Sequence, residues 1–169
     1  MEFSLNAEEI LAIVEEIKLN GVAFYKHLAR YGPKGEVRKM LVKLVEMEER
    51  HAMCFAEMRS HLSEHDKEST VFHRGSDEWM YLREMAGHHV FEVESDPCEL
   101  LDGDITADSV VRLAIDKEKD LMIFILELKR VVLSRDRNGQ IEAIISEEMK
   151  HIAELGRFAA LQDAVMSRV

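Results

Sequence analysis

Proline and glycine, which are common in the turns that join short strands, are scarce in this chain. Its 169 residues include 2 Pro and 8 Gly, while Glu, Lys, Leu, Met and Ala recur throughout. This composition argues against a fold of many short strands and favours helix. An all-α fold is therefore expected, and the length suits one domain spanning residues 1–169.

Cysteine is also scarce. Cys54 and Cys98 form no C-x-x-C pair, which excludes a zinc ribbon or a rubredoxin-type iron site built within this chain. Both thiols are expected to be inert, as suits a reduced cytoplasmic setting.

Long apolar runs and an excess of positive charge are absent. The longest purely apolar run, LMIFIL at 121–126, is too short to cross a bilayer, and the start MEFSLNAEE has no basic and apolar leader pattern. The formal net charge is -11, with 22 basic residues scattered among 33 acidic ones. Nucleic acid and anionic membranes would be repelled, so neither is expected as a partner.

Apolar residues at helical spacing indicate two long helices in the first part of the chain. The first is expected over about 7–31, after an Asn6 cap with Glu9 at the capping-box position. The stretch YGPKGE then breaks it, and the second helix continues to about His65. Because the turn between them is short, these helices at about 7–65 should pair antiparallel.

A second helix pair is expected at about 106–167, after a charged connector at about 66–105. The connector offers Ser76 as the cap of a short helix, followed by a loop that contains proline and glycine. The third long helix begins after a Thr106 cap. The stretch RDRNGQ turns the chain into the fourth helix, which begins at about Ile141.

The two helix pairs carry the same motif one hundred residues apart, as Glu48-x-x-His51 and Glu148-x-x-His151. The same shift superimposes many core positions of the first pair on the second, among them Ile13 on Leu113, Phe24 on Phe124, Leu28 on Leu128, Leu44 on Ile144 and Val45 on Ile145. Two hairpins in one register, joined by a long crossover, describe a four-helix bundle with an approximate internal two-fold axis.

Each Glu-x-x-His can direct a carboxylate and an imidazole at one point, because positions i and i+3 share a helix face. Alone, either motif is better explained as a solvated helix face. Both follow apolar residues at core spacing, however, and a buried carboxylate is costly unless something compensates it. Two facing motifs therefore favour a divalent metal. Glu118 adds a carboxylate on the third helix, but the hundred-residue shift places Lys18 where its mate should be.

These motifs resemble the rubrerythrin-like branch of the ferritin-like di-iron carboxylate superfamily over most of the chain. The resemblance rests on EERH at 48–51, EEMKH at 147–151, IDKEKDLMIF around Glu118, NGVAFY at 20–25 and YLREMAGHHVF in the connector. It implies a ferritin-like four-helix bundle with a dinuclear iron site. It further implies that Glu48 and Glu148 bridge two irons, that His51 and His151 each bind one of them, and that Glu118 is a terminal ligand.

The sequence also departs from that family. Lys18 stands where the first-helix carboxylate is expected, Leu121 replaces a further Glu, and the rubredoxin-like module is absent. Three carboxylates and one protonated lysine leave two negative charges, which suit one divalent ion. We therefore hypothesise one well-occupied metal held by Glu118, His151, Glu148 and Glu48, with a weak or empty second position near His51 and Lys18.

Three alternatives remain open for the Lys18 position. Beside metals, Lys18 can lose its proton and become a neutral ligand. Glu15, one turn earlier, can turn inward in its place and complete a two-metal site. Lys18 can also extend to solvent from the margin of the bundle.

The metal and the function stay open at this stage. Mixed oxygen and imidazole ligands suit iron, with zinc or manganese as alternatives. The resemblance implies a non-haem iron oxidoreductase that reduces peroxide or dioxygen and needs an external electron donor. The alternative is a non-catalytic metal-binding, iron-handling or structural protein with one occupied site. A homodimer is expected in both cases, and no residue is assigned a catalytic role.

Overall fold

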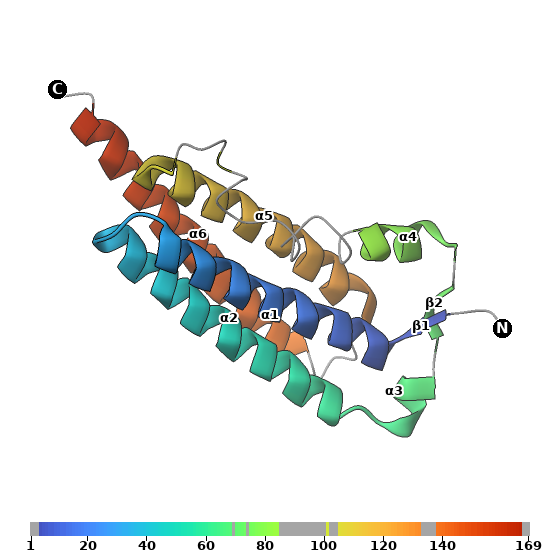
Figure 1. The fold of residues 1–169 in the computed structure, drawn as a ribbon. Helices are drawn as coiled ribbons and strands as arrows, with labels where there is room; N and C mark the ends of the chain where they lie inside the picture. Colours follow the sequence, from blue (N-terminus) through green and yellow to red (C-terminus); the bar gives the residue numbers. More distant parts are fainter. Residues whose placement is uncertain are drawn as a thin grey trace.

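The computed structural model describes residues 4–68, 70–73, 75–84, 101, 105–132 and 138–166. Four long helices form a bundle (Figure 1), and the predicted all-α four-helix fold is confirmed. The long helices are α1 (Ala7–Tyr31), α2 (Glu36–Ser60), α5 (Ala107–Val132) and α6 (Asn138–Met166). The short elements gather at one end of the bundle, and they are β1 (Ser4–Asn6), α3 (Glu64–Glu68), β2 (Thr70–His73) and α4 (Asp77–Glu84).

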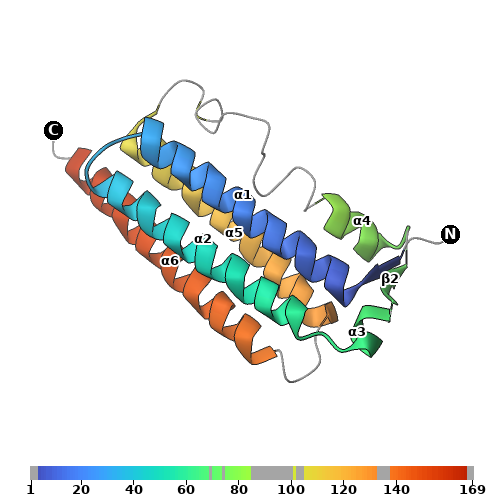
Figure 2. The ribbon, with the colours of Figure 1, turned by 60° about the horizontal axis from the view of Figure 1, so that its bottom comes forward.

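The long helices are arranged as two hairpins. α1 packs chiefly against α2, and α5 packs chiefly against α6. The hairpins stack so that α1 lies beside α5 and α2 beside α6 (Figure 2). Gly35, in the turn between α1 and α2, has a φ of 73°, a conformation that other residues adopt only under strain. This glycine lets the chain reverse within a few residues.

Side-chain caps set the beginnings of three helices. Asn6 Oδ1 accepts the backbone N–H of Glu9 at 2.9 Å, and the Glu9 carboxylate accepts the backbone N–H of Asn6 at 2.9 Å. This is the predicted capping box. The hydroxyls of Ser76 and Thr106 each accept a backbone N–H from three residues later, at 3.2 and 3.1 Å, so both predicted caps are confirmed.

The structure corrects two helix boundaries. α2 ends at Ser60, before the predicted end near His65, because the backbone N–H of His61 closes the last turn of the helix. α6 begins at Asn138, before the predicted start near Ile141. Residues 85–100 and 102–104 of the connector, which include Cys98 and the proline and glycine of the predicted loop, lie outside the described residues.

A small sheet that the sequence did not predict joins the start of the chain to the connector. β1 pairs antiparallel with β2, with Ser4 opposite His73 and Leu5 opposite Phe72. Its first strand ends at Asn6, which is also the cap of α1. The sheet therefore attaches the first residue of the bundle to the crossover.

Apolar side chains from all four long helices form one core, which includes Leu11, Val14, Leu41, Leu44, Val111, Ala114, Leu121, Ile141 and Ile144. A few polar side chains are buried among them, and these form the centre described below. Among the helices of the described residues, none has the length and apolar character that crossing a membrane requires.

Candidate metal centre

Among the described residues, five lysine, glutamate and histidine side chains are buried in the apolar core, and every long helix contributes at least one. Lys18 comes from α1, Glu48 and His51 from α2, Glu118 from α5 and Glu148 from α6. His51 is 3% exposed and the other four are 0% exposed. Because an unpaired buried charge is very costly, the charges of this centre need compensation, either from one another or from a bound ion.

Lys18 lies between two of the carboxylates. Its Nζ donates to Glu48 Oε1 at 3.1 Å and also to Glu148 Oε1. Burial disfavours the ammonium, but the carboxylates of Glu48, Glu148 and Glu118 outweigh it and raise the pKa of Lys18 above its usual value. Lys18 is therefore a buried cation. It does not extend to solvent.

Glu15 does not take the place of the missing first-helix carboxylate. Its Oε2 lies 2.7 Å from Arg59 Nη2, in an ion pair between α1 and α2 at the margin of the bundle. This pair holds Glu15 toward Arg59, so Lys18 is the charged residue that α1 contributes to the buried centre.

His51 connects α2 with two consecutive glutamates of α6. Its Nδ1 lies 2.9 Å from Glu148 Oε1, and its Nε2 lies 3.0 Å from Glu147 Oε2. The hydrogen bond from His51, helped by its charge and by Arg50, lowers the pKa of Glu147 despite partial burial. The Glu147 side chain is 45% exposed, so this line of contacts runs from the surface into the core. Glu147 is not among the predicted site residues, although it directly precedes Glu148.

Glu118 is held by a tyrosine of α1. Tyr25 donates its hydroxyl to Glu118 Oε1 at 2.5 Å, and the Tyr25 ring packs edge-on against Phe24 at 5.3 Å between centroids. Burial raises the pKa of Glu118 well above its usual range, with help from the charges of Glu48 and Glu148. The hydrogen bond fixes one carboxylate oxygen of Glu118 and leaves the other oxygen available.

His151 has different surroundings from His51. Its ring is half-buried, which lowers the pKa of His151, and in the described part of the chain no hydrogen bond or ion pair holds it. The repeat explains the difference, because the mate of Glu147 is Met47, a buried apolar residue. The nitrogen ligand of His151 is therefore uncommitted.

Within this centre, three buried carboxylate oxygens have no hydrogen-bond partner among the described residues, namely Glu48 Oε2, Glu118 Oε2 and Glu148 Oε2. Glu15 Oε2 and Asp108 Oδ1, outside the centre, also lack one. Such orphaned polar atoms are rare in folded proteins, and a bound cation would satisfy the three of the centre. In addition, Glu48, His51 and Glu148 offer ligand atoms within 4.8 Å of one another. Oxygen and imidazole ligands of this kind suit iron, manganese or zinc, so the residues fit a transition-metal ion.

The two motif glutamates differ in ionisation. Burial raises the pKa of Glu48 to about 7, although Lys18 opposes the shift. Burial also opposes ionisation of Glu148, but Lys18 and His51 outweigh it and lower the pKa of Glu148 to about 2. With all three buried carboxylates ionised, their charges and that of Lys18 sum to two negative charges. One divalent cation would balance them and would displace the protons that burial favours on Glu48 and Glu118.

The uncommitted ligands match the set that the sequence hypothesis assigned to a single ion. They are the Oε2 atoms of Glu48, Glu118 and Glu148 and the ring of His151. On the other side, Glu148 Oε1 already contacts both Lys18 and His51. An ion on the His51 side would have to displace those contacts. We call the contacts of Lys18 and His51 with Glu148 Oε1 the engaged side of the centre, and the four uncommitted ligands its open side. The ligand atoms within 4.8 Å of one another belong to Glu48, His51 and Glu148, so the convergence of the open-side ligands on one ion, like the metal binding of all five predicted residues, stays a prediction.

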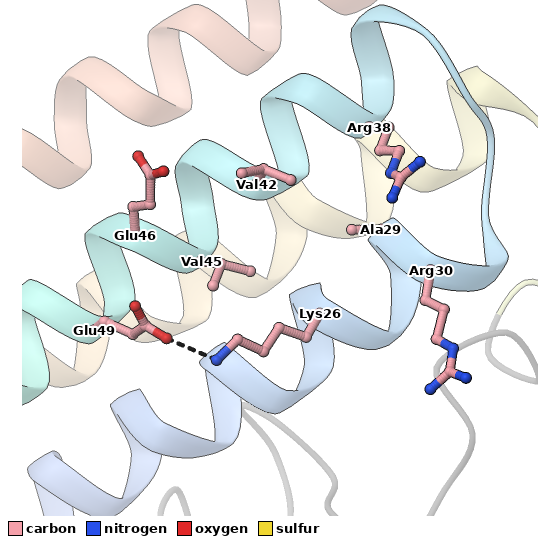
Figure 3. A pocket seen from close by; sticks show the side chains of 8 residues that line it. All are labelled: Lys26, Ala29, Arg30, Arg38, Val42, Val45, Glu46 and Glu49. Atoms are coloured by element: carbon pink, nitrogen blue, oxygen red, sulfur yellow. Dashed lines mark hydrogen bonds and ion pairs between the residues drawn. The ribbon is translucent and has the colours of Figure 1, made fainter.

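A pocket on the outside of the bundle is separate from this centre. It lies over α1 and α2 (Figure 3), and its lining includes none of the five buried residues. The ion pair between Lys26 Nζ and Glu49 Oε1, at 2.7 Å, lies in this pocket. The centre itself is enclosed by the core.

Comparison with solved structures supports the fold and the type of site. The chain is similar to a crystal structure from Thermotoga maritima of a protein provisionally assigned as ferritin-like diiron-carboxylate. The TM-score is 0.69 at 25% sequence identity, covering 95% of this chain and 98% of the other. No protein-family model and no curated protein matches the chain. The chain thus has a ferritin-like diiron-carboxylate fold, and the rubrerythrin-like branch stays a prediction.

Proposed function

We propose that the protein binds iron in the core of its bundle and acts as a non-haem oxidoreductase that reduces peroxide or dioxygen. The observation that supports metal binding is the group of three buried carboxylate oxygens without partners, on Glu48, Glu118 and Glu148. The similarity to a protein described as ferritin-like diiron-carboxylate supports iron over manganese and zinc. The external electron donor and the homodimer remain part of this proposal.

In this proposal each residue of the centre has a distinct task. Glu48, Glu118, Glu148 and His151 would hold the ion, and the bound iron would supply the electron-transfer step. Tyr25 holds Glu118 Oε1 and leaves Oε2 without a partner, so that Oε2 would be available to bind the ion. The surrounding apolar core keeps bulk water away, which strengthens every charge interaction inside it.

A second candidate is a non-catalytic metal-binding or iron-handling protein. It is favoured by the engaged side of the centre, where Lys18 and His51 already satisfy Glu148 Oε1 without any metal. An ion on the open side would then serve to balance charge. Both candidates share the same ligands and differ in whether bound iron reacts.

Anoxic loading with ferrous iron tests both candidates. The protein is stripped with a chelator, loaded, dialysed and analysed for iron, and hydrogen peroxide is then added while ferric absorption is followed. We expect retained iron that is oxidised rapidly and in proportion to the iron bound. Retained iron that resists peroxide would support the second candidate, and failure to retain iron would contradict both.

Matched variants show whether the iron is in the proposed centre. Glu118→Gln keeps the shape of the side chain but removes a charged ligand, so it should reduce iron retention strongly. Glu46→Gln, at an exposed position of α2, should retain as much iron as the unmodified protein. Equal loss in the two variants would show that the iron is bound elsewhere.

A further inference from the structure

Lys18 lies between the two equivalent glutamates of the hundred-residue repeat. Glu48 and Glu148 are mates under the hundred-residue shift, and Lys18 Nζ contacts one oxygen of each. A compact ammonium group between two facing carboxylates lies where an ion bridged by them would lie. Lys18 is 0% exposed, so an ion from solvent cannot take this place unless the side chain moves.

The histidine on the same side is engaged as well. His51 faces Glu147 Oε2 and Glu148 Oε1 with its two ring nitrogens, whereas His151 has no such partners among the described residues. A second ion near His51 would have to break one of these contacts and approach an ammonium group. Both requirements oppose a dinuclear site.

The charge balance of the centre also opposes a second ion. With Lys18 protonated, one divalent ion neutralises the three buried carboxylates, and a second would leave two positive charges uncompensated in an apolar core. A purely structural ion-pair cluster is the other explanation for Lys18. It leaves the three orphaned Oε2 atoms unexplained, whereas one ion on the open side accounts for them.

We propose that the Lys18 ammonium permanently replaces one of the two metal ions of a dinuclear carboxylate site, so that the centre accepts a single ion. This inference rests on the proposed metal binding and specifies its stoichiometry and its side. The ion lies with Glu118 and His151, and Lys18 and His51 hold the opposite side closed.

Counting ions in a charge-reversed variant tests the proposal. Lys18→Glu removes the cation and supplies the carboxylate that the repeat lacks. After anoxic loading with ferrous iron and dialysis, we expect Lys18→Glu to retain one more ion per chain than the unmodified protein. No gain in Lys18→Glu would overturn the proposal.

Lys26→Glu is the matched control, because it too lies on α1 and pairs with a glutamate of α2. Its partner is Glu49 (Figure 3), and both side chains are about half exposed. Lys26→Glu should retain the same number of ions as the unmodified protein. An equal gain in both variants would mean that added negative charge, and not the place of Lys18, controls the count.

A second variant keeps the proposal testable if Lys18→Glu does not fold without metal. Lys18→Met preserves the length of the side chain but removes the cation, so the three carboxylates depend more on metal. The rise in melting temperature on adding ferrous or zinc ions should be larger in Lys18→Met than in the unmodified protein or in Lys26→Met. An equal rise in all three would contradict the proposal.

These measurements separate this inference from the proposed function. Two ions in the unmodified protein would overturn the role of Lys18 and leave the proposed iron binding intact. No ion in the unmodified protein but one in Lys18→Glu would overturn both the proposed iron binding and the single-ion count, and it would leave only the exclusion of a metal by Lys18.

Discussion

The two hairpins of the bundle have the same sequence register but build different halves of the centre. α1 has a buried lysine, Lys18, at the position where α5 has a buried glutamate, Glu118. The partner helices are alike at Glu48 and Glu148, which are both fully buried. A nearly symmetrical backbone therefore carries an asymmetrical set of charges, and one residue accounts for most of the difference.

A second difference between the hairpins separates the two histidines. His51 finds Glu147 and Glu148 on α6, whereas the position equivalent to Glu147 on α2 is Met47. His151 therefore has no acidic side chain in the corresponding place. The comparison shows that the ligand motif alone does not determine whether its histidine is available to a metal.

The largest expected effect on stability distinguishes the two motif glutamates. Glu148→Ala removes the acceptor that Lys18 and His51 share, and we expect the free energy of unfolding to fall by about 3–5 kcal/mol. Glu48→Ala should cost less, because Glu48 accepts a hydrogen bond from Lys18 only. Urea denaturation in chelator measures both. Equal losses would show that the two halves are energetically equivalent.

The next effect concerns pH in the metal-free protein. The pKa of Glu48 is raised from 4.5 to about 7, so its contribution to stability is complete below pH 4.5 and is lost as the pH rises through 7. Glu148, with its pKa lowered to about 2, contributes in the opposite sense, and its stabilisation is lost as the pH falls from 4.5 toward 2.

Glu48→Gln should therefore remove the titration that weakens the fold between pH 4.5 and 7. We expect the fall in unfolding free energy over this range to become smaller by about 3 kcal/mol. Urea denaturation at several pH values, with chelator present, gives the two slopes. An unchanged slope would assign this pH dependence to other groups.

The smallest expected effect compares the histidines. His51→Ala removes two contacts with carboxylates and should reduce the free energy of unfolding by about 2 kcal/mol, whereas His151→Ala should change it by about 0.5 kcal/mol or less. The order should reverse for iron affinity, because His151 is the proposed ligand and His51 a supporting residue. Urea denaturation with chelator present measures the loss of stability in each variant, and titration with ferrous iron measures the loss of iron affinity. If the same histidine variant showed the larger loss in both measurements, the proposed difference between His51 and His151 would be contradicted.

The sequence predicted the bundle well because its signals are local. Apolar spacing located the four long helices, and Asn6, Ser76 and Thr106 supplied caps that the structure confirms. The small sheet was missed because it pairs Ser4–Asn6 with Thr70–His73. Two strands this short, and this far apart in the chain, leave no periodic signal.

Most residues of the centre could be predicted from the sequence, but the hydrogen bonds and ion pairs between them could not. Helical spacing predicted that Glu48 and Glu148 lie on the buried stripe or at its margin, and both are buried. Helical spacing could not predict whether the Lys18 side chain is buried or extends to solvent, because the direction of a long side chain depends on the charged groups of the neighbouring helices. The contact between Glu147 and His51 was missed for the same reason.

The strand β1 has a consequence far from the end of the bundle where it lies. It leads directly into Asn6, the cap of α1, while its pairing with β2 attaches it to the crossover. Slippage of α1 by one residue would advance it by about 1.5 Å and rotate its side chains by about 100°. That motion would withdraw the Lys18 ammonium from both carboxylates. The short sheet thus acts as an anchor that keeps a buried charge aligned about three helical turns away.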